Sequence, residues 1–187
     1  MIENKEQSIS RQVVFFDADK TLWQVVTKDG SDDWASKIQN ATFVKEDENN
    51  VVRVENGTKF VLKEGVKECL QKISREGIGL GVVSDNLPED VIKLADLFGI
   101  LDFIDSKLVN VSLWEGPCPK EVMIKEVVEK IGPENFSGIL LVDDKDYGEA
   151  MKSSGYSFIQ SPKDIFPKDL IYEHFGIKNV GNGENSK

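Results

Sequence analysis

The sequence has few of the residues on which several common functional sites depend. Its 187 residues include a single histidine, His174, and two cysteines, Cys69 and Cys118. One histidine argues against metal centres built on histidine and against a Ser-His-Asp triad. We expect His174 to lie on the surface of the last helix. Two cysteines are too few for a disulfide framework or a cysteine-rich zinc site.

Long apolar runs and an excess of positive charge are also missing. No apolar run approaches the roughly 18 residues of a membrane-spanning helix, and the N-terminal residues MIENKEQSIS lack the apolar segment of a signal peptide. The 33 acidic residues outnumber the 23 lysines and arginines, for a net charge of −10. This balance argues against a nucleic-acid partner, because no large positive surface is available to bind phosphate groups. We expect a cytoplasmic protein that binds neither membranes nor nucleic acids.

The length and composition predict one globular domain over residues 1–187. A chain of this length typically buries about 70% of its extended-chain surface, so its core needs no disulfides. Apolar residues make up 40% and charged residues 30% of the chain, as is typical of soluble globular proteins. Within this domain we expect a loose N-terminus over 1–11, an insertion over 24–62 and a polar tail over 176–187.

Short apolar strands alternate with amphipathic helices along most of the chain. The strands that stand out are Val13–Phe16, Ile78–Val83, Gly138–Val142 and Tyr156–Ile159. Apolar residues at helical spacing predict helices between Glu64 and Gly77, after Pro88, after Pro119 and over 165–175. This alternation predicts an α/β fold with a parallel sheet and helices on both of its faces. In such sheets the ligand site lies beyond the carboxyl ends of the strands.

The insertion over 24–62 has a different pattern. It contains the strand-like runs Ala41–Val44, Val51–Val54 and Lys59–Leu62. Asn56-Gly57 stands between the last two runs, and this dipeptide strongly favours a hairpin turn. We therefore expect one or two hairpins that project from the main body.

Polar side chains follow three of the predicted strands where each strand ends. The first strand is followed by Asp17 and Asp19, the second ends at Ser84, and the third is followed by Asp143 and Asp144. Four carboxylates at one edge of a sheet would repel one another and raise one another's pKa unless a cation neutralised them. Mg²⁺ suits such a site because it prefers oxygen ligands.

A lysine is expected near the same edge of the sheet. Lys120 begins the helix that precedes the third of these strands, so its charge can reach the carboxylates. A positive charge at a helix N-terminus opposes the helix dipole and needs a compensating reason. Carboxylates, a metal, a hydroxyl and a lysine together are suited to binding a phosphate dianion.

These residues resemble the motifs of the haloacid dehalogenase (HAD) superfamily. The run from Asp17 to Leu22 (DADKTL) matches its DxDxT motif, and Ser84, Lys120 and Asp143-Asp144 match its second, third and fourth motifs in order and spacing. The resemblance covers roughly residues 12–160. Trp23 and the run LKEGVKECLQKISREGIGLGVVSDN are similar to the magnesium-dependent acid phosphatase branch. The resemblance implies a Rossmann-like three-layer core, a small β-hairpin flap after the first motif and no large cap domain.

The resemblance also implies a role for each matching residue. Asp17 is the expected nucleophile that forms an aspartyl-phosphate, and Asp19 is the expected general acid and base. Ser84 is expected to bind a phosphate oxygen, and Lys120 to neutralise charge on the phosphate and on Asp17. Metal and lysine would screen the repulsion between the attacking carboxylate and the phosphate.

The expected metal is Mg²⁺, held by Asp17, Asp143 and the backbone carbonyl of Asp19, with Asp144 orienting water beside it. Further phosphate or substrate contacts are expected from the residues that flank the motifs, namely Ala18, Asp85 and Asn86. Related phosphatases often carry Asn four residues after Asp144, where this chain has Gly148. A supporting hydrogen bond is then absent unless Lys145 or Asp146 replaces it.

Three functions are compatible with this pattern. The first is a Mg²⁺-dependent phosphatase that hydrolyses a phosphomonoester of a small metabolite or a phosphoprotein. The second is phosphoryl or glyceryl transfer, because DADKTLWQVVTKDG also resembles glyceryl-transferring HAD proteins; these need a thiol, and only Cys118 is expected near the site. The third is a phosphate-binding module without catalysis. The sequence is compatible with a monomer or a homodimer. Trp23 and Trp34 could either pack in the flap or line the substrate entrance.

Overall fold

A central sheet of five parallel strands organises the fold of the computed structural model, which describes residues 10–27, 42–46, 50–112 and 119–178. Its strand order is β7-β6-β1-β8-β9. The strands are β1 (Arg11–Phe16), β6 (Gly79–Ser84), β7 (Val109–Val111), β8 (Phe136–Asp143) and β9 (Ser157–Gln160). Every pairing in this sheet is parallel. The predicted α/β fold is therefore confirmed.

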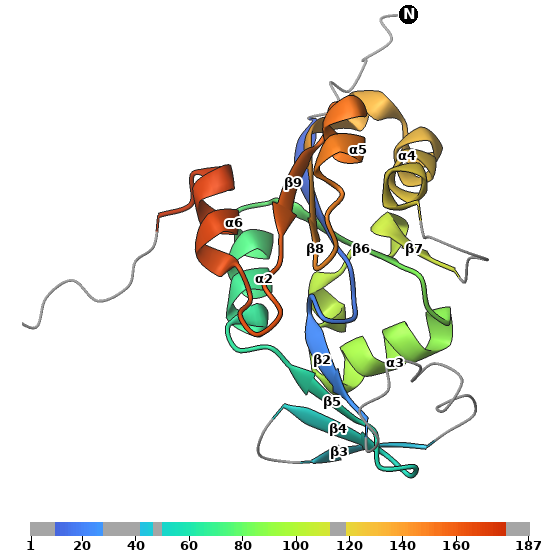
Figure 1. Ribbon diagram of the computed structural model, residues 1–187. Coiled ribbons are helices and arrows are strands. Elements are labelled where there is room, and N and C mark those ends of the chain that lie inside the picture. Colours follow the sequence, from blue (N-terminus) through green and yellow to red (C-terminus); the bar gives the residue numbers. More distant parts are fainter. Residues whose placement is uncertain (1–9, 28–41, 47–49, 113–118, 179–187) are drawn as a thin grey trace, which may run out of the picture.

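Helices cover both faces of this sheet (Figure 1). In β1, Val14 and Phe16 belong to one apolar core, whereas Val13 and Phe15 belong to a second core. This separation follows from the alternation of side chains across a strand. The first core includes buried residues of α2 (Val66–Arg75), α3 (Pro88–Leu97) and α6 (Lys168–Phe175), and the second those of α4 (Lys120–Ile131) and α5 (Gly148–Ser153).

Prolines begin the helices α3 and α4 much as the sequence predicts. Pro88 is the first residue of α3, and Pro119 directly precedes α4. Short 3-10 turns at Leu101–Phe103, Ser106–Leu108 and Pro133–Asn135 complete the connections. His174 is exposed on α6, as predicted. Among the described residues, no helix is long and apolar enough to cross a membrane.

A second, smaller sheet lies beyond the carboxyl ends of the central strands (Figure 1). It consists of β2 (Trp23–Val26), β5 (Lys59–Leu62), β4 (Val51–Val54) and β3 (Phe43–Glu46), in that order and antiparallel throughout. The predicted turn at Asn56-Gly57 is present, with Gly57 at φ 90° and its N–H bonded to the Val54 carbonyl at 2.8 Å.

One boundary expected in this region is wrong: the strand predicted at Ala41–Val44 lies at Phe43–Glu46. Strand β2 was not predicted as a strand. The expected hairpins are present as the antiparallel pairs β3–β4 and β4–β5, and one face of the small sheet is buried. Trp23, Phe60 and Val52 are fully buried, and the Trp23 ring lies 5.7 Å from the ring of Phe98, which caps the C-terminus of α3. The apolar face of the sheet needs a covering partner, and α3 contributes to it through Phe98 and through Lys93, whose Nζ lies 4.7 Å from the centroid of the Phe43 ring.

The ends of the chain are described only in part. The loose N-terminus expected over 1–11 is wrong at Arg11, which begins β1 and pairs with the central sheet, while residues 1–9 lie outside the described part. The polar tail expected over 176–187 is described to residue 178 only. Trp34 and Cys118 also lie outside the described residues.

Candidate active site

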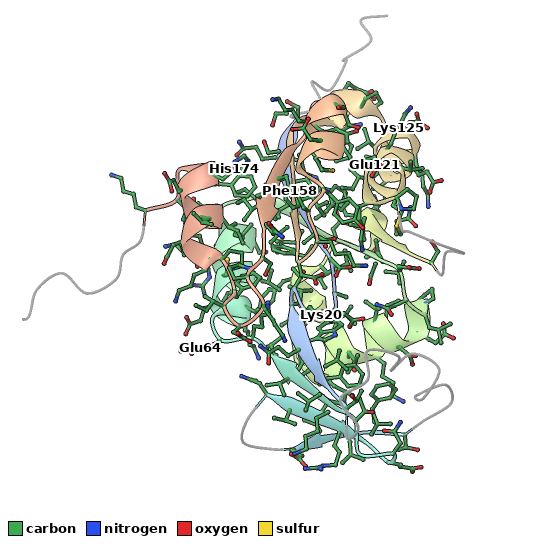
Figure 2. The ribbon with its side chains drawn as sticks, viewed as in Figure 1. Lys20, Glu64, Glu121, Lys125, Phe158 and His174 are labelled. Carbon is green, nitrogen blue, oxygen red and sulfur yellow. The ribbon has the colours of Figure 1, made fainter. Side chains whose placement is uncertain are left out.

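The loop after β1 enters the site directly from the centre of the sheet. The Asp17 N–H bonds to the Val142 carbonyl of β8 at 3.0 Å, which continues the sheet pairing for one more residue. The chain then turns, and the carbonyl of buried Ala18 accepts the Leu22 N–H at 2.9 Å. Lys20 has the left-handed φ of 61°, and its N–H bonds to the Trp23 carbonyl at 2.7 Å. Figure 2 labels Lys20 between the two sheets.

Three carboxyl groups meet at the ends of β1 and β8. One oxygen from each of Asp17, Asp143 and Asp144 lies within 4.8 Å of the others. Asp17 and Asp143 are buried, and Asp144 is half-buried. Burial raises the pKa of Asp143 and of Asp144, and the negative charge of Asp17 raises both further. The expected convergence of these three strand-end residues is confirmed as geometry.

Lys120 supplies a buried positive charge to this group. Its Nζ donates to Asp17 Oδ1 at 2.5 Å and to the Val83 carbonyl at 2.8 Å. It also lies 3.8 Å from Asp143 Oδ2. The lysine side chain is 3% exposed, so solvent screens these interactions little. The start of α4 therefore places the Lys120 charge beside Asp17 and Asp143. These two acids compensate for the unfavourable position of a lysine at a helix N-terminus.

The three carboxyl groups fit a divalent cation. Asp143 Oδ1 accepts the Lys145 N–H at 2.9 Å, but Asp143 Oδ2 is buried and accepts no hydrogen bond from any described residue. Lys120 Nζ, at 3.8 Å, is beyond hydrogen-bond distance of this oxygen, so a directly coordinated cation would offset the cost of burying it. Oxygen donors of this kind are those that Mg²⁺ prefers. Asp17, Asp143 and Asp144 are therefore suited to hold a divalent metal ion.

Asp19 lies only two residues from Asp17 but has different neighbours. Its Oδ1 accepts the indole N–H of Trp23 at 2.7 Å, and its Oδ2 accepts the side-chain N–H of Asn86 at 2.8 Å. Burial, followed by the charge of Asp17, raises the pKa of Asp19 to about 7, although both hydrogen bonds oppose the rise. A carboxyl group with this pKa can carry and release a proton near neutral pH.

The residues around the end of β6 are brought to the same site. Ser84 is fully buried, and its Oγ accepts a hydrogen bond from Asn86 Nδ2 at 2.9 Å. The Asn86 amide thus contacts Ser84 and Asp19, which connects two of the predicted motifs. Asp85 is half-buried beside them. Ala18, Ser84, Asp85 and Asn86 all lie at the carboxyl edge, where phosphate contacts were expected.

The contacts of two side chains at the site, Trp23 and Lys63, were not predicted from the sequence. Trp23 was expected to pack or to line an entrance, and its bond to Asp19 carries no sequence signal. Lys63, at the end of β5, is buried; its Nζ donates to the Pro162 carbonyl at 2.8 Å and lies 3.4 Å from Ser161 Oγ. Burial lowers the pKa of Lys63, and the charges of Asp144 and Asp164 oppose that shift.

The structure also bears on the position where related phosphatases carry Asn. The Gly148 N–H bonds to Asp146 Oδ1 at 2.9 Å, so Asp146 supports the start of α5. The backbone N–H of Lys145 bonds to Asp143, as described above. Asp143 therefore has one supporting hydrogen bond that does not depend on the side chain at 148.

Comparisons with known proteins agree with this fold. The HAD domain of the effector protein Lem4 from Legionella pneumophila aligns with a TM-score of 0.51 at 15% identity, covering 90% of this chain and 95% of that one. A Thermotoga maritima protein provisionally described as a β-phosphoglucomutase aligns with a TM-score of 0.53 at 14% identity, covering 89% and 100%. At these identities the similarity concerns the fold alone.

The sequence comparisons define the family. No curated protein matches this sequence significantly. The family model for haloacid dehalogenase-like hydrolases matches residues 4–160, which is most of the chain and includes every motif residue discussed above. The chain therefore belongs to the haloacid dehalogenase-like hydrolase family.

Proposed function

We propose that this chain is a Mg²⁺-dependent phosphatase that hydrolyses a phosphomonoester through an aspartyl-phosphate on Asp17. The observation that carries the proposal is the contrast between the two carboxyl groups of one loop. Asp17 faces Lys120 and two further acids, whereas Asp19 faces Trp23 and Asn86 and has a pKa of about 7. Two acids whose environments differ in this way can divide the roles of nucleophile and proton donor.

The proposed metal ligands are Asp17, Asp143, Asp144 and the backbone carbonyl of Asp19. When bound, Mg²⁺ supplies a Lewis acid that withdraws charge from the phosphate oxygens and screens them from the carboxylates. Lys120 adds a second, fixed positive charge on the Asp17 side. Ser84 and the neighbouring Ala18, Asp85 and Asn86 are the proposed phosphate and substrate contacts.

The proposed reaction has two displacements at phosphorus. In the first, an oxygen of Asp17 forms a bond to phosphorus while the bond to the leaving oxygen breaks, and Asp19 gives its proton to that oxygen. In the second, water attacks the phosphorus of the aspartyl-phosphate while Asp19 takes a proton from the water. The bond between phosphorus and Asp17 then breaks and releases inorganic phosphate.

The substrate is a phosphomonoester of a small metabolite or of a phosphoprotein. Among the described residues, the small four-stranded sheet is the only sheet beyond the carboxyl edge of the central sheet. A site without a large cap would admit a phosphorylated side chain on a protein surface as well as a small molecule.

Hydrolysis of p-nitrophenyl phosphate with and without Mg²⁺ tests the proposal. We expect Mg²⁺-dependent turnover that is lost in Asp17→Asn and in Asp143→Asn. Asp102→Asn is the matched control, because Asp102 is an exposed acid in the 3-10 turn after α3 and makes none of the contacts described at the site. Turnover that persists in Asp17→Asn, or that does not need a divalent cation, would overturn the mechanism. Mg²⁺ binding without turnover of any phosphomonoester would favour a binding module instead.

A further inference from the structure

Both oxygens of the Asp19 carboxyl group are already bound by protein N–H groups. The indole N–H of Trp23 is bonded to Oδ1 at 2.7 Å, and the amide N–H of Asn86 is bonded to Oδ2 at 2.8 Å. These donors come from different parts of the fold: Trp23 begins β2 of the small sheet, and Asn86 follows β6 of the central sheet. The carboxyl plane is therefore held from two directions.

The indole donor is itself held firmly. Trp23 is fully buried, and its ring lies against Phe98 at a centroid distance of 5.7 Å. Its backbone is bonded within the same loop: its carbonyl accepts the Lys20 N–H at 2.7 Å, and its N–H bonds to the Ala18 carbonyl at 3.4 Å. The ring and the main chain both restrict the position of the indole N–H.

The amide donor is also fixed. Asn86 is buried, and its Nδ2 bonds to Ser84 Oγ at 2.9 Å as well as to Asp19. These two contacts define which end of the amide faces the carboxyl group, because only the nitrogen can donate to a carboxylate. A side chain whose amide nitrogen is used in this way acts on Asp19 directly.

Two fixed donors would have a specific effect on a general acid. When a carboxylic acid gives its proton to a leaving oxygen, negative charge develops on its own two oxygens. Donors that already point at those oxygens stabilise that charge without reorganisation. They also keep the carboxyl group in one orientation, and correct orientation is a large part of efficient proton transfer.

We propose that Trp23 and Asn86 are positioning residues for Asp19, and that their N–H groups orient its carboxyl group for proton transfer to the leaving oxygen. This inference rests on the proposed phosphatase function. It gives the small sheet a catalytic purpose, because the first residue of that sheet supplies one of the two donors. It also adds to the proposed substrate contact of Asn86 a direct action on Asp19.

A purely structural role for Trp23 is the competing explanation. Buried indole N–H groups normally have a hydrogen-bond partner, whatever their function. The test must therefore distinguish an effect on proton transfer from an effect on stability. Comparing substrates whose leaving groups differ in basicity does so, because only proton transfer depends on that basicity. The two probes are p-nitrophenyl phosphate, which releases a weakly basic phenolate, and phenyl phosphate, which releases a more basic one and depends more on protonation.

The main variant is Trp23→Phe, which keeps an aromatic ring in the core and removes only the N–H and part of the ring system. We expect kcat/KM for phenyl phosphate to fall about tenfold more than kcat/KM for p-nitrophenyl phosphate, as is expected for loss of one hydrogen bond to a developing charge. Phe98→Leu is the matched control, since it changes the packing against the Trp23 ring and leaves the indole N–H of Trp23 in place. It should lower both values by the same factor.

Asn86→Ala keeps the test valid if Trp23→Phe does not fold. We expect the same dependence on the leaving group, beyond any loss of a phosphate contact, which would lower kcat/KM for both substrates by the same factor. Equal losses for both substrates in Trp23→Phe and Asn86→Ala would overturn the inference. Asp19→Asn separates the two proposals. If Asp19→Asn lowers kcat/KM equally for both substrates, the proposed acid role of Asp19 is wrong. If Asp19→Asn shows the leaving-group dependence but Trp23→Phe and Asn86→Ala do not, only the positioning role is wrong.

Discussion

The two sides of the candidate site are built on opposite principles. On the central-sheet side, three acids and Lys120 are gathered where water is largely excluded. On the small-sheet side, Trp23 and Phe60 are fully buried in an apolar core that also contains α3. The first arrangement is costly for folding, because burial and mutual repulsion disfavour charged carboxylates. The second is favourable, because apolar burial is the main stabilising contribution to a fold.

The comparison shows where stability and function reside in this chain. Buried acids placed close together destabilise the fold, but with Lys120 they form a group that is suited to binding a cation and an anion. Apart from Lys63, which follows β5, the small sheet supplies little charge to the site, but it holds Trp23 in place beside Asp19. Truncation of a residue on the packed side should therefore change the free energy of unfolding more than the activity. Substitution of a residue on the charged side should change the activity more than the free energy of unfolding.

The largest expected effect on stability lies on the packed side. Phe60→Ala removes a fully buried ring that lies 6.0 Å from the ring of Phe43. We expect the free energy of unfolding to fall by about 3–5 kcal/mol, as is typical of such truncations in a core. Denaturant unfolding measures this value. Val26→Ala is the control, because Val26 is 49% exposed on the same sheet and should change stability little.

The largest effect on activity short of removing the nucleophile is expected at Lys120. Lys120→Met keeps much of the length of the side chain and removes the charge that is bonded to Asp17. We expect kcat for p-nitrophenyl phosphate to fall by about 10²–10³-fold, the range for losing one preorganised charge contact in a water-excluded site. Lys125→Met on the exposed face of the same helix is the matched control (Figure 2). Similar activity losses in both variants would contradict the account.

A smaller effect, with a defined sign, concerns pH. Burial raises the pKa of Asp143 above the ordinary value of 3.8, so the folded protein binds a proton that the unfolded chain releases. The contribution of this group to stability is therefore present at low pH and is lost as the pH rises above about 4. Asp143→Asn removes this titration. In the presence of a chelator, the variant should be more stable than the wild type at about pH 8, by at least about 1 kcal/mol.

Unfolding curves with chelator at several pH values measure this difference. The gap between variant and wild type should narrow as the pH falls through about 7 and should close below about 4, where the carboxyl group becomes protonated in the unfolded state as well. A wild type that stays more stable than Asp143→Asn across the range would show that the buried acid is not destabilising. Mg²⁺ should stabilise the wild type and should lose most of that effect in the variant.

The smallest expected effect is at the exposed edge of the small sheet. Arg53 Nε bonds to Glu46 Oε1 at 2.5 Å, but both side chains are about 40% exposed. Exposed ion pairs contribute little because solvent and salt screen them, so Arg53→Ala should change the free energy of unfolding far less than Phe60→Ala does. The same denaturant measurement tests this expectation, and a loss comparable to that of Phe60→Ala would mean that charge also stabilises the packed side.

The central sheet and the charged side of the site could be predicted from the sequence, because both depend on local patterns. Val13–Phe16 and Gly138–Val142 are strand-like by composition, and each is followed by acids where a parallel sheet places ligands. The convergence of Asp17 and Asp143 then follows from strand order. Lys120 is recognisable because a lysine is unfavourable at a helix N-terminus.

The packed side could not be predicted in the same way. Strand β2 is formed through its pairing with β5, which is distant in sequence, and Trp23–Val26 is only four residues long, although Trp and Val favour strands. The packing of the small sheet on α3 depends on contacts such as Trp23 with Phe98. The hydrogen bond from the Trp23 indole to Asp19, and the burial of Lys63, likewise follow from the three-dimensional arrangement and have no signal in the sequence.

The division of roles between Asp17 and Asp19 is the central claim, and trapping of a phosphorylated protein tests it most directly. Asp19→Asn, mixed with p-nitrophenyl phosphate and Mg²⁺, should release one equivalent of p-nitrophenol rapidly and accumulate a phosphoryl group on Asp17, since the residue that activates water is gone. Mass spectrometry of the intact protein and of the peptide containing Asp17 measures this. A phosphoryl group on another residue, or one that still forms in Asp17→Asn, would contradict the account.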